Sequence, residues 1–317
     1  MRQSARLVAA LGLLAVCAAA AELPAFYNRV SGAVWVVKDL NGPLAAWRSI
    51  GLEQVEDHGR IVLDAASQRG ARLATGRLGG FAVELLQPEP GDAVFDRFLQ
   101  QHGNGVFAVV HTAPDQAAVD AENARLDKLG VGVLRTLEMN GARYTFFDTA
   151  AQGKYVLALV VRPHAGPATP ARITHLGLVI RDAAAVGAYW QHLGFPAMPV
   201  VEASPRADMR YRNKPLWFSF KVGWHSYAHP TFEWIIPPLD PSNCYADFLR
   251  LHGEGVQHLG MPVDDLALAV GRYALLDFPP VQIGAWGETG QPNSGRYAYM
   301  DTEALGGVSM ELIHAIP

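Results

Sequence analysis

The sequence predicts an α+β fold built from four units with the element order βαβββ, arranged in two pairs. Two observations carry this prediction: the chain contains two similar halves, and each half divides again into a repeated order of strands and helix. The duplication is clearest in two glycine-containing stretches, 98–106 and 248–256, which read FLQQHGNGV and FLRLHGEGV. Matching residues recur on both sides at equal spacing, so one half is about 145 residues long.

The first residues of the chain, 1–21, differ from everything that follows. Two arginines precede an apolar run, and a series of alanines then resembles the cleavage site of a secretory signal peptide. We therefore expect a periplasmic or secreted protein. Lipoprotein anchoring at Cys17 is the less favoured alternative, because Val16 stands where a small residue is preferred. Cleavage would leave Cys244 as the one cysteine, so no internal disulfide is expected.

The chain after the signal peptide is predicted to divide into an N-terminal pair of units (22–161), a linker (162–171) and a C-terminal pair (172–317). The linker is placed where three prolines and a glycine disfavour a helix or a central strand. The four units occupy these approximate ranges: 27–90, 104–161, 172–238 and 255–316.

The helix of the third unit is the best marked. Asp182 suits the N-cap position, and Gly194 can end the helix in the left-handed conformation. Between them, apolar side chains recur at helical spacing: Val186, Tyr189, Trp190 and Leu193. We therefore expect Tyr189 and Trp190 to pack in the core rather than to contact a ligand.

Composition and charge narrow the class of protein. Half of the residues are hydrophobic and 18% are charged, which allows a well-buried core. The net charge of −4, with no block of like charge, argues against binding to nucleic acid. No stretch beyond the signal peptide is apolar enough to span a membrane. We expect a monomer or homodimer that acts on a small molecule.

Four polar residues stand inside short apolar runs that are predicted to be strands. They and their runs are His175 (173–180), Glu233 (231–236), His258 (256–261) and Glu311 (308–313). Burying such side chains costs free energy unless a partner compensates them. Two imidazoles and two carboxylates on converging strands suit one divalent metal ion: Zn, Ni, Co, Mn or Fe(II). Gly177 and Gly260 should leave space beside these residues.

The order of the units and the positions of these four residues resemble the vicinal oxygen chelate superfamily, which includes glyoxalases, bleomycin-resistance proteins and extradiol dioxygenases. The stretches 232–238 and 248–259 are closest in motif to the methylmalonyl-CoA epimerase and glyoxalase-like branch. The resemblance implies that each pair of units closes into a half-open barrel. It also places ligands on the first strands, at His175 and His258, and on the last strands, at Glu233 and Glu311.

For the glyoxalase-like branch, the resemblance implies a metal-dependent lyase or isomerase that stabilises an enediolate of a substrate with two vicinal oxygens. Glu311 is expected to be the base, with Glu233 as the alternative. An extradiol-type Fe(II) dioxygenase is the second function considered. Against it, Glu233 fills a coordination position, and the stretch 295–297 lacks the histidine expected there. A periplasmic binding protein of the same fold is the third, and the complete ligand set argues against it.

The first half offers an internal comparison. Its residues at the four equivalent positions are Gly32, Glu84, Ala108 and Ala158, so one of four potential ligands remains. We therefore expect the first half to bind no metal in this way and to cover or shape the cavity of the second half. Glu84 is interpreted as a leftover or surface carboxylate.

Other polar residues give weaker signals. Five basic residues lie between strands of the third unit and either contact a substrate anion or, as we favour, belong to solvated loops: Arg210, Arg212, Lys214, His225 and His229. His102 and His252 occupy matching loops and are expected to have a structural role in a turn. His314 should lie on the strand face opposite Glu311. Nothing beside Cys244 in the sequence marks it as a nucleophile.

Overall fold

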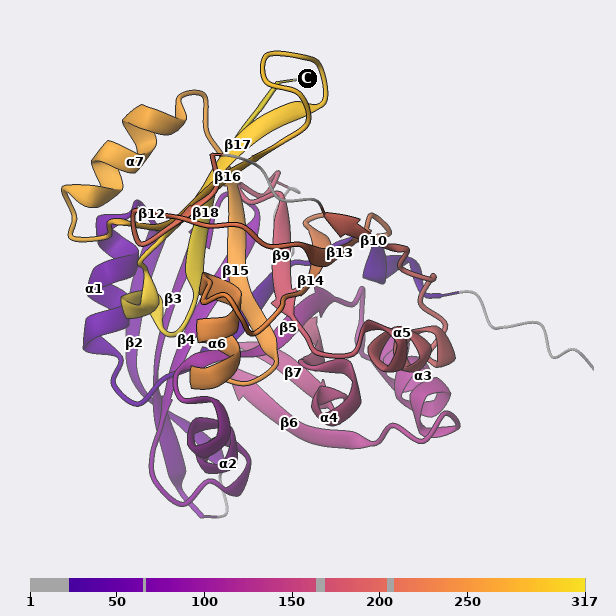
Figure 1. Ribbon diagram of the computed structural model, residues 1–317. Helices are drawn as coiled ribbons and strands as arrows, with labels where there is room; N and C mark the ends of the chain where they lie inside the picture. Colours follow the sequence, from indigo (N-terminus) through magenta and orange to yellow (C-terminus); the bar gives the residue numbers. More distant parts are fainter. Residues whose placement is uncertain (1–22, 65–66, 164–168, 204–207, 317) are drawn as a thin grey trace, which may run out of the picture.

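The computed structural model describes residues 23–64, 67–163, 169–203 and 208–316; the signal peptide predicted over 1–21 and the middle of the predicted linker lie outside them. Within these ranges the chain forms two mixed β-sheets, one from each half, with helices packed around them (Figure 1). Each half contains two βαβββ units joined by one further helix, and the third unit carries two additional short strands, β11 (Arg210–Tyr211) and β12 (Lys214–Pro215). The predicted α+β fold is therefore confirmed.

The first half contains η1 (Ala25–Asn28), β1 (Gly32–Val36), α1 (Asn41–Ser49), β2 (Glu53–Asp64), β3 (Arg69–Leu78), β4 (Phe81–Pro88), α2 (Ala93–His102), β5 (Gly105–Thr112), α3 (Gln116–Asp127), β6 (Val133–Met139), β7 (Ala142–Phe147), α4 (Ala150–Gly153) and β8 (Val156–Val161). The order of strands in its sheet is β2-β3-β4-β1-β5-β8-β7-β6.

The second half contains β9 (His175–Val179), α5 (Ala183–His192), β10 (Val200–Ala203), β11 (Arg210–Tyr211), β12 (Lys214–Pro215), β13 (Phe220–His225), β14 (Thr231–Ile236), α6 (Cys244–Leu251), β15 (Gly255–Pro262), α7 (Leu266–Ala274), β16 (Pro280–Trp286), β17 (Ser294–Met300), η2 (Glu303–Leu305) and β18 (Ser309–Ile316). The order of strands in its sheet is β10-β13-β14-β9-β15-β18-β17-β16-β11-β12.

The centre of each sheet is built in the same way. The first strands of the two units pair antiparallel, β1 with β5 and β9 with β15. Each first strand also pairs in parallel with the last strand of its own unit. As a result, the first and last strands of two units lie side by side in the middle of each sheet, where side chains from all four strands can meet on one face.

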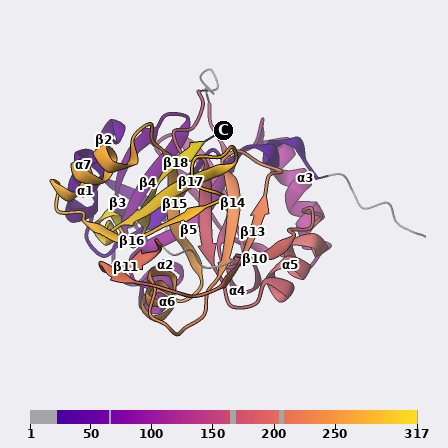
Figure 2. The ribbon, with the colours of Figure 1, turned by 45° about the horizontal axis from the view of Figure 1, so that its top comes forward.

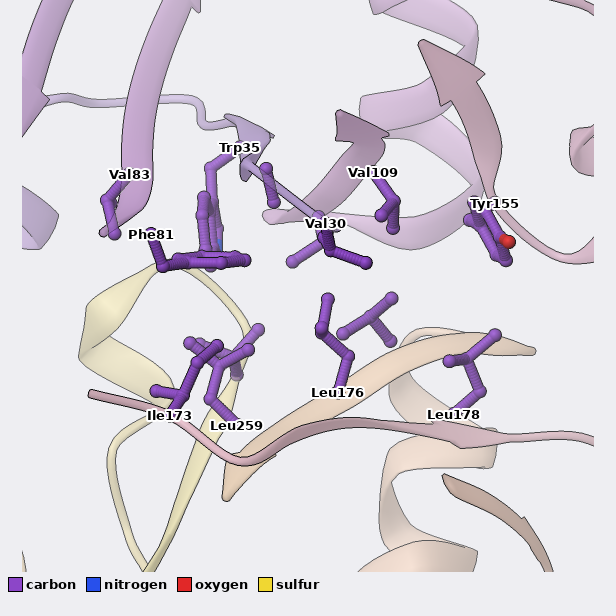
Figure 3. Packing of buried hydrophobic residues seen from close by; sticks show 14 of the residues in the cluster. Val30, Trp35, Phe81, Val83, Val109, Tyr155, Ile173, Leu176, Leu178 and Leu259 are labelled. Atoms are coloured by element: carbon purple, nitrogen blue, oxygen red, sulfur yellow. The ribbon is translucent and has the colours of Figure 1, made fainter. Parts of the chain in front are cut away.

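The two sheets pack back to back through one apolar cluster that both halves share (Figure 3). Side chains alternate between the faces of a strand, so Leu176 and Leu178 of β9 point into this cluster and His175 points to the opposite face. On β1, Trp35 points into the cluster from the other side. Full burial of each such side chain stabilises the fold by about 1.5–3 kcal/mol. The opposite, concave face of each sheet therefore does not take part in the contact between the halves.

Helix α5 follows the sequence prediction. Asp182 caps it by accepting a hydrogen bond from the Ala185 amide, 3.0 Å, and Gly194 just beyond its end has a positive φ of 90°. Trp190 is buried and donates its indole N–H to the carbonyl of Gly153 in α4, 3.1 Å. The apolar stripe of α5 therefore binds the two halves together.

The connection between β10 and β13 has no counterpart in the first half, where β2 and β3 form a direct hairpin. It leaves one edge of the second sheet at β10 and adds the short strands β11 and β12 to the other edge, at β16. Figure 2 shows β10 and β11 on opposite sides of this sheet. The described parts of this segment therefore lie at the two opposite edges of the second sheet.

None of the helices in the described ranges combines the length and the apolar character needed to cross a membrane.

Candidate metal centre

The four residues singled out in the sequence lie together on the concave face of the second sheet. His175 Nε2 is 2.9 Å from Glu311 Oε2, and His258 Nε2 is 3.0 Å from Glu233 Oε2. The two Nε2 atoms are 3.1 Å apart, and one potential ligand atom from each of the four residues lies within 4.8 Å of the others. All four side chains are buried.

The strand register explains why these residues meet. In the antiparallel pair of β9 and β15, His175 lies opposite Gly260, and His258 lies opposite Gly177. In the parallel pairs, Glu233 of β14 is the neighbour of Gly177, and Glu311 of β18 is the neighbour of Gly260. Each glycine thus has a histidine on one side and a glutamate on the other.

Each imidazole occupies the space that a side chain on the opposite strand would fill. A Cβ atom added to Gly177 would lie 1.7 Å from Cε1 of His258, and one added to Gly260 would lie 2.1 Å from Cε1 of His175. Carbon atoms cannot approach so closely without bonding. The expectation that these glycines make room for the two rings is confirmed, and both positions require glycine.

Neighbouring side chains orient the two rings. Nδ1 of His258 lies 2.7 Å from Oε1 of the buried Gln257, and Nδ1 of His175 lies 3.1 Å from the Thr174 hydroxyl. The Thr174 hydroxyl donates its own hydrogen to the Gly260 carbonyl, 3.3 Å, so it accepts from His175. Both Nδ1 atoms are therefore donors, which leaves each Nε2 facing the cluster, as in metal-bound histidines.

The donor set fits one divalent ion. Two ligand atoms that are each about 2.1 Å from one ion, with bonds at a right angle, lie about 3 Å apart. The three shortest pairs, at 2.9, 3.0 and 3.1 Å, have this separation. Two Nε2 atoms this close also need a proton or a metal ion among the four groups, because their lone pairs otherwise repel each other. The residues fit one metal ion.

Burial shifts the pKa values of the site in opposite directions for acids and bases. It raises the pKa of Glu233 to about 8, helped by the nearby carboxylate of Glu311. It lowers the pKa of His258 to about 4, so this ring is neutral at pH 7. Burial alone would raise the pKa of Glu311 too, but hydrogen bonds from His175 and Tyr299 and the nearby imidazoles lower it. The two carboxylates are therefore not equivalent.

A cavity of about 670 Å³ opens beside the cluster and is lined by His175, Glu233 and Glu311 together with aromatic and aliphatic side chains. Tyr299 is the cross-strand neighbour of Glu311 and packs against the ring of His258, with centroids 5.0 Å apart. Trp224 packs against His175 in the same manner, at 4.9 Å. The lining residues in the described ranges all belong to the second half. The first half therefore supports the sheet from behind and does not cover the cavity there.

The first half keeps the register but not the ligands. Gly32 lies opposite Val110, Ala108 lies opposite Val34, and Ala158 is the parallel neighbour of Val110. These pairs match those of the second half residue by residue, so the alignment of the two halves made from the sequence holds in the structure.

The interpretation of Glu84 as a surface carboxylate is wrong. Glu84 is buried, accepts a hydrogen bond from the Tyr144 hydroxyl and forms an ion pair with Arg162, 2.8 Å. Arg162 belongs to the predicted linker and reaches back into the first sheet. A guanidinium thus supplies the positive charge that the surviving glutamate requires.

The five basic residues of the third unit do not line the cavity, within the described part of the chain. Four of them are exposed, as favoured: Arg210, Arg212, Lys214 and His229. The fifth, His225, does not fit that interpretation, because it is buried and lies 2.7 Å from the Pro196 carbonyl. His314 lies on the opposite strand face from Glu311, as predicted, with Nδ1 3.2 Å from the Val263 carbonyl.

His102 and His252 have the expected structural role. Nδ1 of His102 lies 2.7 Å from the His252 carbonyl, and Nδ1 of His252 lies 2.6 Å from the His102 carbonyl. This reciprocal pair joins the matching loops of the two halves. Cys244 is buried at the start of α6, and burial raises its pKa, so its thiol is not activated as a nucleophile.

Several partners of the site were not predicted from the sequence. For Gln257 the sequence offers one signal, its position directly before His258. The side chain of a residue next to a ligand histidine can reach Nδ1 of that histidine. Tyr299 and Trp224 are close to the site only through strand pairing, which no local pattern reveals.

Comparison with known proteins places the fold. No protein-family model matches the chain, and no curated protein matches it in sequence. Among solved structures, a mutant of 4-hydroxymandelate synthase from Streptomyces coelicolor superposes with a TM-score of 0.61 at 14% identity, over 90% of this chain and 92% of that one. The Mn(II)-bound glyoxalase from Novosphingobium aromaticivorans gives 0.51 at 13% identity, over 92% and 83%.

The chain has the vicinal oxygen chelate fold. A fusion of a xylose isomerase-like TIM barrel with 4-hydroxyphenylpyruvate dioxygenase also superposes, with a TM-score of 0.54 at 15% identity, over 91% of this chain. This chain spans 49% of the fusion protein. In this chain the candidate metal centre lies in the second pair of units, and the first pair lacks three of its four residues.

Proposed function

We propose that the protein is a metal-dependent enzyme of the glyoxalase and epimerase type, a lyase or isomerase acting on a small substrate with vicinal oxygens. The observation that carries the proposal is the position of Glu233. Its carboxylate lies 3.0 and 3.5 Å from the two imidazole Nε2 atoms, inside the cluster and not beside it. The ligand set is then His175, His258, Glu233 and Glu311.

A divalent ion held by these residues supplies Lewis-acid stabilisation of the negative charge that develops on a carbonyl oxygen of the substrate. The protein's own task is to take a proton from the carbon beside that carbonyl and to return it. A carboxylate at the site can do so when it lies within hydrogen-bond reach of that carbon's proton.

The hydrogen bonding supports Glu233 as this base, in place of Glu311, which the sequence favoured. Each carboxylate is paired with one proposed ligand histidine, Glu311 with His175 and Glu233 with His258, but Glu311 also accepts a hydrogen bond from Tyr299 that holds it in place. Both carboxylates line the cavity, so either can reach a bound substrate.

Substitution of His258 by alanine tests the proposal. We expect the variant to lose the metal that wild-type protein retains after dialysis, measured by inductively coupled plasma mass spectrometry. Wild-type protein should also exchange the α-proton of an α-hydroxyketone for deuterium in D₂O, followed by NMR, and the Glu233→Gln variant should not. Unchanged metal content in His258→Ala would overturn the assignment of the site.

An extradiol-type dioxygenase is the second candidate. It is favoured by the superposition of both halves on a dioxygenase-containing fusion and on 4-hydroxymandelate synthase, and by the fact that His175, His258 and Glu311 alone are a two-histidine, one-carboxylate set. After anaerobic loading with Fe(II), we expect no oxygen uptake across a panel of catechols. Rapid uptake would reverse the order of the two candidates.

We also propose that the protein is exported, on the basis of the signal-peptide pattern over 1–21. Expression of the full chain in a bacterium, followed by N-terminal sequencing of the periplasmic fraction, should give a mature protein that begins near Glu22. Recovery of the intact N-terminus in the cytoplasm would contradict export, and a lipid-modified Cys17 would support the anchored alternative.

A further inference from the structure

The walls of the cavity beside the candidate metal centre are mainly aromatic. Six aromatic rings line it: Phe220, Trp224, Tyr245, Trp286, Tyr297 and Tyr299. Four of them form a connected group: the ring of Tyr299 is centred 5.3 Å from Tyr245 and 5.6 Å from Tyr297, and Phe220 lies 5.8 Å from Tyr245. Such edge-to-face surfaces stabilise a planar ring more than an aliphatic chain.

Two of these tyrosines carry unused hydrogen-bond donors. Tyr299 bonds to Glu311, but the hydroxyls of Tyr245 and Tyr297 have no hydrogen-bond partner among the described residues, although both side chains are buried. Burial raises the pKa of both phenols, so both keep their hydrogen. Neither hydroxyl is fully enclosed, so each can donate a hydrogen bond to an acceptor on a ligand in the cavity.

The charge of the cavity is one-sided. Among the described residues that line it, the charged groups are Glu233 and Glu311, and none is a lysine or an arginine. A second negative charge on the ligand, remote from the metal ion, would be buried without a partner. The part of the substrate that extends from the metal is therefore expected to be uncharged.

The size of the cavity also excludes a minimal substrate. A volume of about 670 Å³ lies within the range of about 300–1,000 Å³ found for pockets of drug-sized ligands. A three-carbon hydroxyketone would leave most of the aromatic surface uncovered.

We propose that the substrate is an aromatic compound whose vicinal oxygens face the metal centre and whose uncharged ring substituents carry oxygen acceptors that meet the hydroxyls of Tyr245 and Tyr297. This inference rests on the proposed function for the metal-facing end. The aromatic walls and the two donors define the other end.

A series of ligands with one common head group tests the proposal. The probes are hydroxyacetone, 2-hydroxyacetophenone, and the para-methoxy and para-carboxylate derivatives of the latter, each titrated calorimetrically into Mn(II)-loaded protein. Because all four share the α-hydroxyketone, differences in affinity report the rest of the cavity. We expect hydroxyacetone to bind at least about thirtyfold more weakly than 2-hydroxyacetophenone. The para-carboxylate should bind at least about tenfold more weakly than the para-methoxy compound.

Two variants locate the donors. Tyr245→Phe and Tyr297→Phe remove a hydroxyl and keep the ring, and at least one should weaken binding of the para-methoxy compound by about threefold to tenfold, with no effect on 2-hydroxyacetophenone. Tyr273→Phe is the control, because the hydroxyl of Tyr273 likewise has no hydrogen-bond partner among the described residues but lies outside the cavity. It should leave all affinities unchanged.

Equal binding of hydroxyacetone, tighter binding of the para-carboxylate, or unchanged affinities in both tyrosine variants would each overturn the substrate class. Repeating the titrations after removal of metal by a chelator separates this inference from the proposed function. The preference for the aryl probes should persist in the metal-free protein, because it depends on the walls. Failure of wild-type protein to retain Mn(II) in equilibrium dialysis would overturn the metal centre and leave that preference as an independent result.

Discussion

The two sheets share strand order and register but differ in what fills their concave faces. In the second sheet, His175 and His258 lie opposite glycines, and a cavity opens in front of them. In the first sheet the arrangement is reversed: Gly32 and Ala108 lie opposite Val110 and Val34, and apolar side chains fill the interior. In the second sheet a large histidine thus faces a glycine, whereas in the first sheet a valine faces a glycine or an alanine, on the same strand register.

The two sheets also differ in the partner of the glutamate at the equivalent position, Glu233 or Glu84. Glu233 lies among imidazoles that fit a metal ion, whereas Glu84, at the equivalent position, is neutralised by Arg162. A buried carboxylate needs a positive partner in either sheet, and the two halves meet that need in different ways. The backbone alone therefore does not make the site. The exchange of small and large residues and the source of positive charge do.

The largest effect is expected from removing the space that distinguishes the second sheet. Gly177→Ala places a methyl group where the ring of His258 lies, and should lower the affinity for Mn(II) at least about 100-fold and destabilise the fold by about 1–3 kcal/mol. Equilibrium dialysis and urea unfolding measure the two effects. Gly271→Ala in α7, where an added Cβ meets nothing within 4 Å, is the control. Full metal affinity in Gly177→Ala would show that His258 is not a ligand.

A smaller effect on metal affinity is expected when the hydrogen bond that orients the His258 ring is removed and the four proposed ligands are kept. Gln257→Leu removes the acceptor at Nδ1 of His258 and should weaken Mn(II) binding by about 10- to 100-fold, while the fold is retained. Gln257→Glu, which keeps an acceptor at this place, should restore most of the affinity. If both variants bind Mn(II) like wild-type protein, Gln257 does not orient the ring.

The pH dependence should reveal the raised pKa of Glu233. Below pH 8 its carboxyl group holds a proton that a metal ion must displace, so the apparent affinity should rise about tenfold per pH unit up to about pH 8 and level off above it. His258, with a pKa lowered to about 4, adds no proton release in this range. Calorimetry in buffers of different ionisation enthalpy should detect release of about one proton at pH 7. Glu233→Gln should abolish it, and an affinity independent of pH between 6 and 8 would contradict the assignment.

The smallest effect on metal binding is expected in the first sheet. Glu84→Gln keeps the shape of the side chain but removes the charge that pairs with Arg162, and should lower the free energy of unfolding by about 1–2 kcal/mol. Metal content should not change. A loss of metal in this variant would mean that the two halves are coupled at the site, contrary to their separate concave faces.

The sequence was sufficient to predict the fold and the four residues of the site, because the duplication allowed the two halves to be aligned with each other. Gly32, Glu84, Ala108 and Ala158 could be matched to the second half without a structure, and the strand register agrees with each match. What a repeat conveys is position along a strand, and in this fold that position determines which strands and which face a side chain belongs to.

The rest depended on contacts between distant segments. Arg162 was assigned to a linker by the prolines that follow it, and nothing in the sequence indicates that its side chain returns to Glu84. The cavity walls were missed for the same reason, since Tyr245 and Tyr297 come from a helix and a strand that meet only in the folded chain. The first half is a structural partner, as expected, but it does not cover the cavity, because back-to-back packing is decided by the apolar faces of whole sheets.

The pairing of each histidine with a glycine on the facing strand limits how such a site can be gained or lost during evolution. In the first sheet, Ala108→His would drive a ring into Val34, and Gly32→His would drive one into Val110. Each histidine therefore has to be preceded by a change to glycine across the strand pair, a step that leaves a hole and confers no metal binding. A half whose central strand pair carries these two valines therefore cannot gain the metal centre by a single histidine substitution.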